Sequence, residues 1–74
     1  MPSTIITGWV PGLKKVEHTK LVRHHSGMDL RDAKRVTDRV LDKETVAIAM
    51  PTIEEAELLA AKLRAIGALA QACK

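Results

Sequence analysis

The stretch that decides the fold is residues 15–37, KVEHTKLVRHHSGMDLRDAKRVT. Its apolar residues recur every three or four positions, which is typical of amphipathic α-helices. Gly27 interrupts the pattern, and glycine readily adopts the left-handed backbone that often follows the end of a helix. Asp29 then offers a side chain that can cap the N-terminus of a new helix. The stretch therefore predicts two short helices, over 14–25 and 30–41, joined by a tight turn.

The same spacing divides each predicted helix into a buried side and an exposed side. The residues expected to face inward are His18, Leu21, Val22 and His25 in the first helix and Leu30, Ala33, Thr37, Val40 and Leu41 in the second, with Val36 at its edge. The opposite faces carry mostly lysine and arginine. We therefore expect the two helices to present a basic surface.

Segments outside this stretch predict three strands and one more helix. Residues 4–10 and 45–50 are apolar and rich in β-branched side chains, and residues 68–73 are interpreted as a short final strand. Gly8 is expected to mark a bulge in the first strand. Thr52 and Glu55 fit a capping box, in which each side chain would accept a hydrogen bond from the other residue's backbone N–H.

The third helix is expected to run from this box to Ile66. Its predicted core face consists of Ile53, Ala56, Leu59, Ala60, Leu63 and Ile66. The resulting order is β-α-α-β-α-β. The simplest packing is an α/β (α+β) two-layer sandwich, in which a three-stranded sheet carries all three helices on one face. The order of the strands within the sheet is left open.

Composition limits the class of protein. The chain has 74 residues, which predicts a single domain, and its one aromatic residue, Trp9, argues against an aromatic platform for single-stranded nucleic acid. Cys73 is the only cysteine, so neither a disulfide within the chain nor a cysteine zinc site is expected. No apolar run is long enough to span a membrane, and no signal-peptide pattern is present. We expect a cytoplasmic protein with no membrane contact.

The positive charge is concentrated in one half of the chain. Residues 1–41 carry eight lysines and arginines against four acidic residues, whereas residues 42–74 carry four against five. A basic half favours an acidic partner, either a protein or a nucleic acid.

A candidate partner-binding surface follows from these patterns. It comprises Lys15, Val16, Thr19, Lys20, Arg23, Gly27, Met28, Arg31 and Lys34. Its cations would attract an acidic partner over a distance, and the small or apolar residues among them would supply contact area.

This segment also resembles the C-terminal domain of the bacterial large-subunit ribosomal stalk protein. The matching residues, with no gap, are Lys15-Val16, Lys20, Val22-Arg23, Ser26-Gly27-Met28 and Leu30-Arg31-Asp32-Ala33-Lys34. The likeness continues more loosely through the capping box and Ile66-Gly67-Ala68. The resemblance implies a protein-binding domain that contacts translation factors with GTPase activity through its first two helices. It implies contact roles for Lys15, Val16, Lys20, Arg23, Gly27, Met28 and Lys34.

The chain departs from that family at several points. At Thr19 the family usually has isoleucine or valine, which inserts into the partner. Trp9 and the His24-His25 pair are unusual for the family. The chain starts at the first strand, without an N-terminal dimerisation segment or hinge, so we expect a free-standing relative. Its partner would be a translation GTPase, another ribosome-associated factor or an unrelated protein.

Two other binding functions are open at this point. Residues 15–39 have the turn length of a helix-turn-helix, and Arg31, Lys34 and Arg35 would lie near the start of a helix that reads DNA. Against this, Arg23 stands where that motif needs a small residue. An adaptor of an ATP-driven protease has a similar sandwich, but its motifs are absent here. Weak self-association is expected through the outer face of the third helix, around Leu58.

No pattern of catalytic residues is found. Asp29 and Asp32 are explained as helix-capping and first-turn residues, and no nucleophile has both a base and an orienting group beside it. His18 and His25 share a helix face but are separated by about 10 Å along the axis, too far for one ion. We therefore expect no enzyme activity, no cofactor and no metal site, and histidines that lie between core and solvent.

Overall fold

Six elements of secondary structure follow one another in the computed structural model, which describes residues 1–74. They are β1 (Ser3–Trp9), α1 (Lys15–Ser26), α2 (Leu30–Leu41), β2 (Val46–Ala49), α3 (Ile53–Ala65) and β3 (Ala68–Cys73). The predicted β-α-α-β-α-β order and α+β class are confirmed. The predicted ends of the elements differ from the observed ends by no more than one residue.

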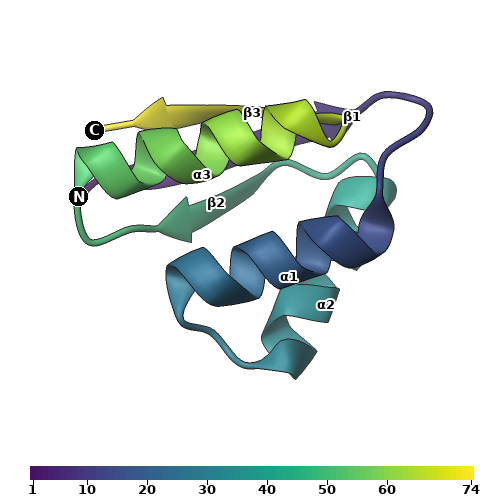
Figure 1. The fold of residues 1–74 in the computed structure, drawn as a ribbon, viewed down its shortest axis with the longest axis horizontal. Helices are drawn as coiled ribbons and strands as arrows, with labels where there is room; N and C mark the ends of the chain where they lie inside the picture. Colours follow the sequence, from purple (N-terminus) through teal and green to yellow (C-terminus); the bar gives the residue numbers. More distant parts are fainter.

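The three strands form one antiparallel sheet in the order β2-β1-β3, so the first strand of the chain is the central one (Figure 1). Ile6 pairs with Val46 on one side and with Ala70 on the other. The register between β1 and β3 shifts between Ile6 and Gly8, which confirms the predicted bulge. Because β1 is central, β2 and β3 are the two edges of the sheet.

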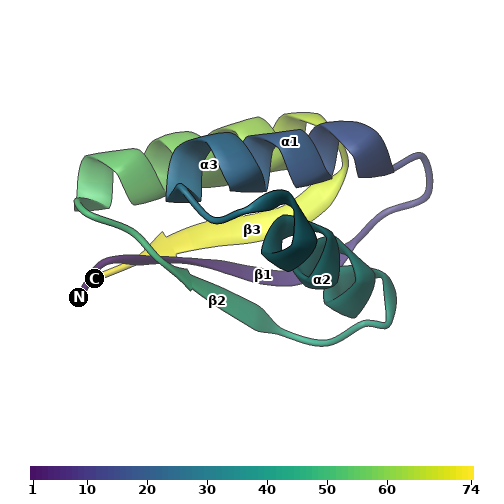
Figure 2. The same cartoon turned by 90° about the horizontal axis from the view of Figure 1, so that it is seen from below.

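All three helices lie on one side of the sheet (Figure 2). Strand residues alternate accordingly, and the core is aliphatic. It consists of Ile6, Val22, Ala33, Val40, Val46, Ile48, Met50, Ala56, Leu59, Ala60, Leu63, Ala68 and Ala70. The helices α2 and α3 pack against the sheet, whereas α1 packs mainly against α2 and α3. Because α1 is the outermost helix, much of its surface is free to meet a partner.

Specific residues fix the turns at the helix ends. Gly27 has φ 78°, and its N–H donates to the carbonyl of Arg23, as expected for a glycine that ends a helix. The carboxylate of Asp29 accepts from the N–H of Asp32 at 2.9 Å and caps α2. These two residues turn the chain within a few positions, so α2 returns beside α1.

The capping box at the start of α3 is only half formed. The hydroxyl of Thr52 accepts a hydrogen bond from the N–H of Glu55 at 3.1 Å, but the Glu55 side chain makes no bond in return. The Glu55 side chain is exposed, so water can satisfy its carboxylate. The prediction was right about where α3 begins and wrong about the reciprocal bond.

Side-chain hydrogen bonds from β1 tie two of the helices to the sheet. The hydroxyl of Thr4, buried in β1, donates to the carbonyl of Ala56 in α3 at 2.9 Å. The indole N–H of Trp9, at the end of β1, donates to the carbonyl of Leu41 at 3.3 Å and so holds the last turn of α2. Neither α3 nor any other helix has the length and apolar character needed to cross a membrane.

Two burial predictions were wrong. Leu30 was expected to face the core, but 44% of its surface is exposed. It is the first residue of α2, at the end of that helix farthest from the sheet, so the core does not reach it (Figure 1). His18 lies on the inward face of its helix, as predicted, but it is completely buried rather than at the boundary between core and solvent, because α2 and α3 both pack against α1.

Candidate partner-binding surface

The outer sides of α1 and α2 enclose a shallow groove, which we call the α1–α2 groove. Its lining residues are Lys15, Val16, Thr19, Lys20, Arg23, Leu30 and Lys34. Six of the seven belong to the surface predicted from the sequence. The groove exists because the tight turn at Gly27 brings the start of α2 back beside α1.

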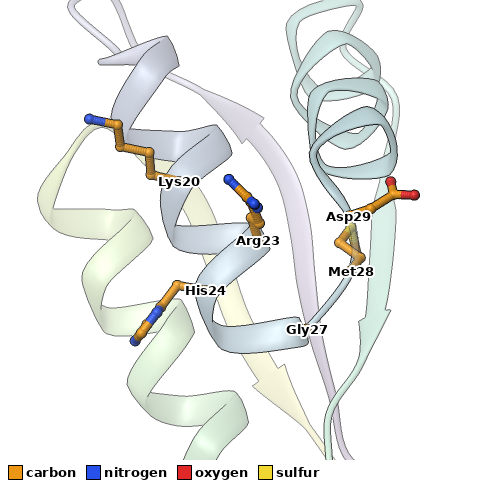
Figure 3. A pocket seen from close by; sticks show the side chains of 6 residues that line it. All are labelled: Lys20, Arg23, His24, Gly27, Met28 and Asp29. Atoms are coloured by element: carbon orange, nitrogen blue, oxygen red, sulfur yellow. The ribbon is translucent and has the colours of Figure 1, made fainter.

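A second depression, which we call the turn depression, adjoins the groove and shares two residues with it (Figure 3). It is lined by Lys20, Arg23, His24, Gly27, Met28 and Asp29. Figure 3 shows the side chain of Arg23 on the side of α1 that faces α2. The structure thus brings eight of the nine predicted surface residues together. Arg31 is exposed on α2 but lines neither depression.

The charge of the α1–α2 groove is entirely positive. Lys15, Lys20, Arg23 and Lys34 line it, and no carboxylate does. The one ion pair of the chain joins Arg39 and Glu44, at 3.8 Å, so the four groove cations have no acidic partner within the protein. Unpaired cations that share a concave surface raise the local concentration of acidic ligands.

The groove also holds two exposed aliphatic side chains. Val16, in α1, is 65% exposed, and Leu30, in α2, is 44% exposed. Burying such side chains against a partner supplies affinity that charge alone does not. Leu30 was not among the surface residues predicted from the sequence. The available signal was its spacing from Lys34, since residues four apart lie on the same face of a helix.

A network of polar side chains lies beneath the groove, between α1 and α2. The hydroxyl oxygens of Thr19 and Thr37 are 2.8 Å apart, and Nδ1 of His18 lies 2.8 Å from the Thr37 oxygen. Thr37 is almost completely buried, and the Nε2 atom of His18 is buried without a partner. Hydrogen-bonded polar side chains therefore lie beneath the cationic residues that line the groove.

Burial sets the ionisation of the histidines. It lowers the pKa of His18 to about 4, because the charged imidazolium would lose its hydration. Burial also lowers the pKa of His25, aided by the nearby charge of Lys62 and by His24 and opposed by Glu55. The rings of His24 and His25 meet edge to face at 5.0 Å, and no cluster of three or more potential metal ligands is present.

The outer face of α3 was the surface expected to support self-association. Leu58 is 43% exposed there, and its neighbours on that face are also exposed. These neighbours are Glu54, Ala61, Lys62 and Ala65. No hollow forms on this face, so self-association through it stays a prediction.

No family model matches the chain, and a search of curated proteins found no match. The case for a function therefore depends on the residues and the geometry of the α1–α2 groove.

Proposed function

We propose that the chain is a non-enzymatic protein-binding domain that docks an acidic surface with an apolar centre through α1 and α2. The observation that carries the proposal is the composition of the α1–α2 groove. Four cations without acidic partners surround two exposed aliphatic side chains, Val16 and Leu30.

The two kinds of residue have different roles in this proposal. Lysine and arginine side chains at the rim steer an acidic partner and speed association, an effect that salt screens. Val16 and Leu30 become buried on docking and slow dissociation. The exposed position of Val16 on the outermost helix allows a partner to reach it without any rearrangement of the fold.

The resemblance to the ribosomal stalk C-terminal domain supports a narrower version of the proposal. In it, the partner is a translation-factor GTPase or another ribosome-associated protein, and the domain works in the cytoplasm. The residues to which the resemblance gives contact roles, from Lys15 to Lys34, all line the groove or the turn depression.

The proposal is tested by capturing partners from the source cell with three forms of the domain. Arg23→Glu reverses the charge of a residue shared by both depressions, whereas Arg35→Glu makes the same change at an exposed residue outside them. Wild type and Arg35→Glu should retain a common acidic protein that Arg23→Glu loses. Circular dichroism of each variant checks that the fold survives. Equal retention by Arg23→Glu would contradict the proposal.

Nucleic acid is the second candidate ligand, because the same four cations could bind phosphates. Its affinity would fall steeply with salt as counterions are released, and Val16→Ala would change it little. A protein partner should instead lose affinity when Val16 is shortened, even at high salt. Measuring the salt dependence of binding for wild type and Val16→Ala separates the two candidates.

A further inference from the structure

Thr19 lines the α1–α2 groove with a side chain that offers either a hydroxyl or a methyl group. If a partner meets the hydroxyl, the groove accepts a polar side chain at this point, and if it meets the methyl group, the groove accepts an aliphatic one. The hydrogen bonds beneath the groove indicate which group faces the partner.

Four contacts compete for the hydrogens of this network. Besides the two distances of 2.8 Å that link His18, Thr37 and Thr19, the Thr19 oxygen lies 3.2 Å from the carbonyl of Lys15, and the Thr37 oxygen lies 3.2 Å from the carbonyl of Ala33. The two hydroxyl groups supply two hydrogens. A third is available only if Nδ1 of His18 carries the proton of the neutral ring.

The environment of His18 favours that tautomer for a second reason. Its Nε2 atom is buried without a hydrogen-bond partner. A hydrogen on Nε2 would be a buried donor without an acceptor, which is rarer and more costly in proteins than an unpaired acceptor. The proton is therefore placed on Nδ1, from which it is donated to Thr37.

The hydrogen of Thr19 then has two possible acceptors. It is donated to the carbonyl of Lys15 if Thr37 donates to Thr19, or to Thr37 if Thr37 donates to Ala33. In both arrangements the hydroxyl of Thr19 is engaged within the pair of helices. Its hydrogen is unavailable to a ligand and its oxygen lies against the buried Thr37, so the methyl group is the part of Thr19 left for the groove.

We infer that the buried side chains of His18 and Thr37 hold the hydroxyl of Thr19 away from the groove, so that the groove presents a methyl group and accepts an aliphatic side chain of the partner. His18 and Thr37 are positioning residues in this arrangement. The inference rests on the proposed function for its binding step, whereas the proton position on His18 can be tested without any partner.

The first experiment measures the tautomer of His18 by long-range ¹H–¹⁵N NMR of the free domain near neutral pH. We expect Nδ1 to be protonated and Nε2 to be bare. Thr37→Ser, which keeps the hydroxyl, should preserve this tautomer, and Thr37→Val should shift the ring signals. A proton found on Nε2 of the wild type would overturn the donor role that the inference gives to His18, whatever the protein binds.

The second experiment uses a designed acidic helical peptide with two leucines one turn apart, titrated by fluorescence anisotropy. Thr19→Val should bind within twofold of wild type, because the methyl is kept. Thr19→Ser should bind about fourfold more weakly, the value for one lost methyl group. Thr37→Val should weaken binding at least threefold, and Thr37→Ser should not.

The reverse order at position 19, with Thr19→Ser binding well and Thr19→Val poorly, would overturn the inference and leave the proposed function standing. Failure of the wild-type domain to bind any acidic apolar peptide would count against the proposed function. In that case the NMR result still decides whether His18 donates to Thr37.

Discussion

Arg64, in α3, donates a hydrogen bond of 2.7 Å from its guanidinium to the carbonyl oxygen of Ala70, in β3. The strand β3 is an edge of the sheet and contains no charged residue. Uncharged edge strands invite pairing with other chains, and a cation that covers the edge opposes this. Arg64 therefore protects a strand that has no protecting charge of its own.

We expect Arg64→Ala to self-associate, because it uncovers the Ala70 carbonyl and removes a charge beside β3. Sedimentation velocity at increasing protein concentration should show a weight-average mass that rises above the 8.1 kDa of one chain. Arg35→Ala removes an equivalent charge from α2 and should stay closer to the wild type. A monomeric Arg64→Ala over the same concentrations would show that the bond does not protect the edge.

The burial of His18 predicts that the domain loses stability in mild acid. Its pKa is about 4 in the folded protein and near 6.5 when the chain is unfolded, so the unfolded state binds more protons between these values. The contribution of His18 is therefore complete above pH 6.5 and falls by up to about 3 kcal/mol as the pH drops to about 4. Burial of His25 lowers its pKa as well and acts in the same direction.

Urea titrations between pH 4 and pH 7.5 measure this effect. His18→Asn keeps an N–H donor near the position of Nδ1 but does not titrate, so its unfolding free energy should vary less with pH than that of the wild type. The same slope in both proteins would assign the acid sensitivity to other groups.

Gly67 should tolerate no side chain. It has φ 105°, and a Cβ atom built on it would lie 3.0 Å from the Cα of Leu13. Gly12 also has a positive φ, 97°, but a Cβ there would meet no atom within 4 Å. Backbone strain should cost each alanine variant about 1–3 kcal/mol of unfolding free energy. Gly67→Ala adds the steric contact, so it should lower the melting temperature by more than Gly12→Ala. Similar melting temperatures would mean that the 10–14 loop moves aside freely.

The half-formed capping box predicts an asymmetry between its two residues. Thr52→Ala should destabilise the domain by about 1 kcal/mol, because it removes the acceptor for the N–H of Glu55. Glu55→Ala removes no observed bond and should cost less. Thermal unfolding of the two variants, followed by circular dichroism, measures the difference. Equal losses would indicate that the reciprocal bond forms in solution.

Leu30 should matter more for binding than for folding, since nearly half of its surface is exposed in the groove. Leu30→Ala should weaken partner binding several-fold while unfolding changes by less than the roughly 2–5 kcal/mol typical of a buried leucine. Leu59→Ala, in the core, should have the opposite effect, with a larger loss of stability than of binding. A large loss of stability in Leu30→Ala would indicate that Leu30 contributes to the core.

The sequence was sufficient where structure depends on neighbours in the chain. Helix periodicity, the cap at Asp29 and the glycine at position 27 are local signals, and they located α1 and α2. The composition of the strand segments and the cap at Thr52 are also local, and they located the remaining elements. It was insufficient where contacts are long-range. The central place of β1 requires pairing with strands some 40 and 65 residues away, which no local pattern records.

The candidate surface shows the same division. Helical spacing grouped most of the groove residues, because α1 and α2 are regular helices. The spacing did not reveal that α2 projects beyond the core at Leu30, or that His18 would meet Thr37 from the neighbouring helix. Both facts depend on where α2 is placed relative to α1 and the sheet.

The bond between the indole of Trp9 and the carbonyl of Leu41 has a practical consequence. Trp9 is the only tryptophan, and the chain has no tyrosine, so ultraviolet emission from the unlabelled protein comes from one chromophore. That emission reports whether the last turn of α2 is seated on β1. Because Trp9 does not line the α1–α2 groove, the optical signal follows unfolding with little interference from ligand occupancy.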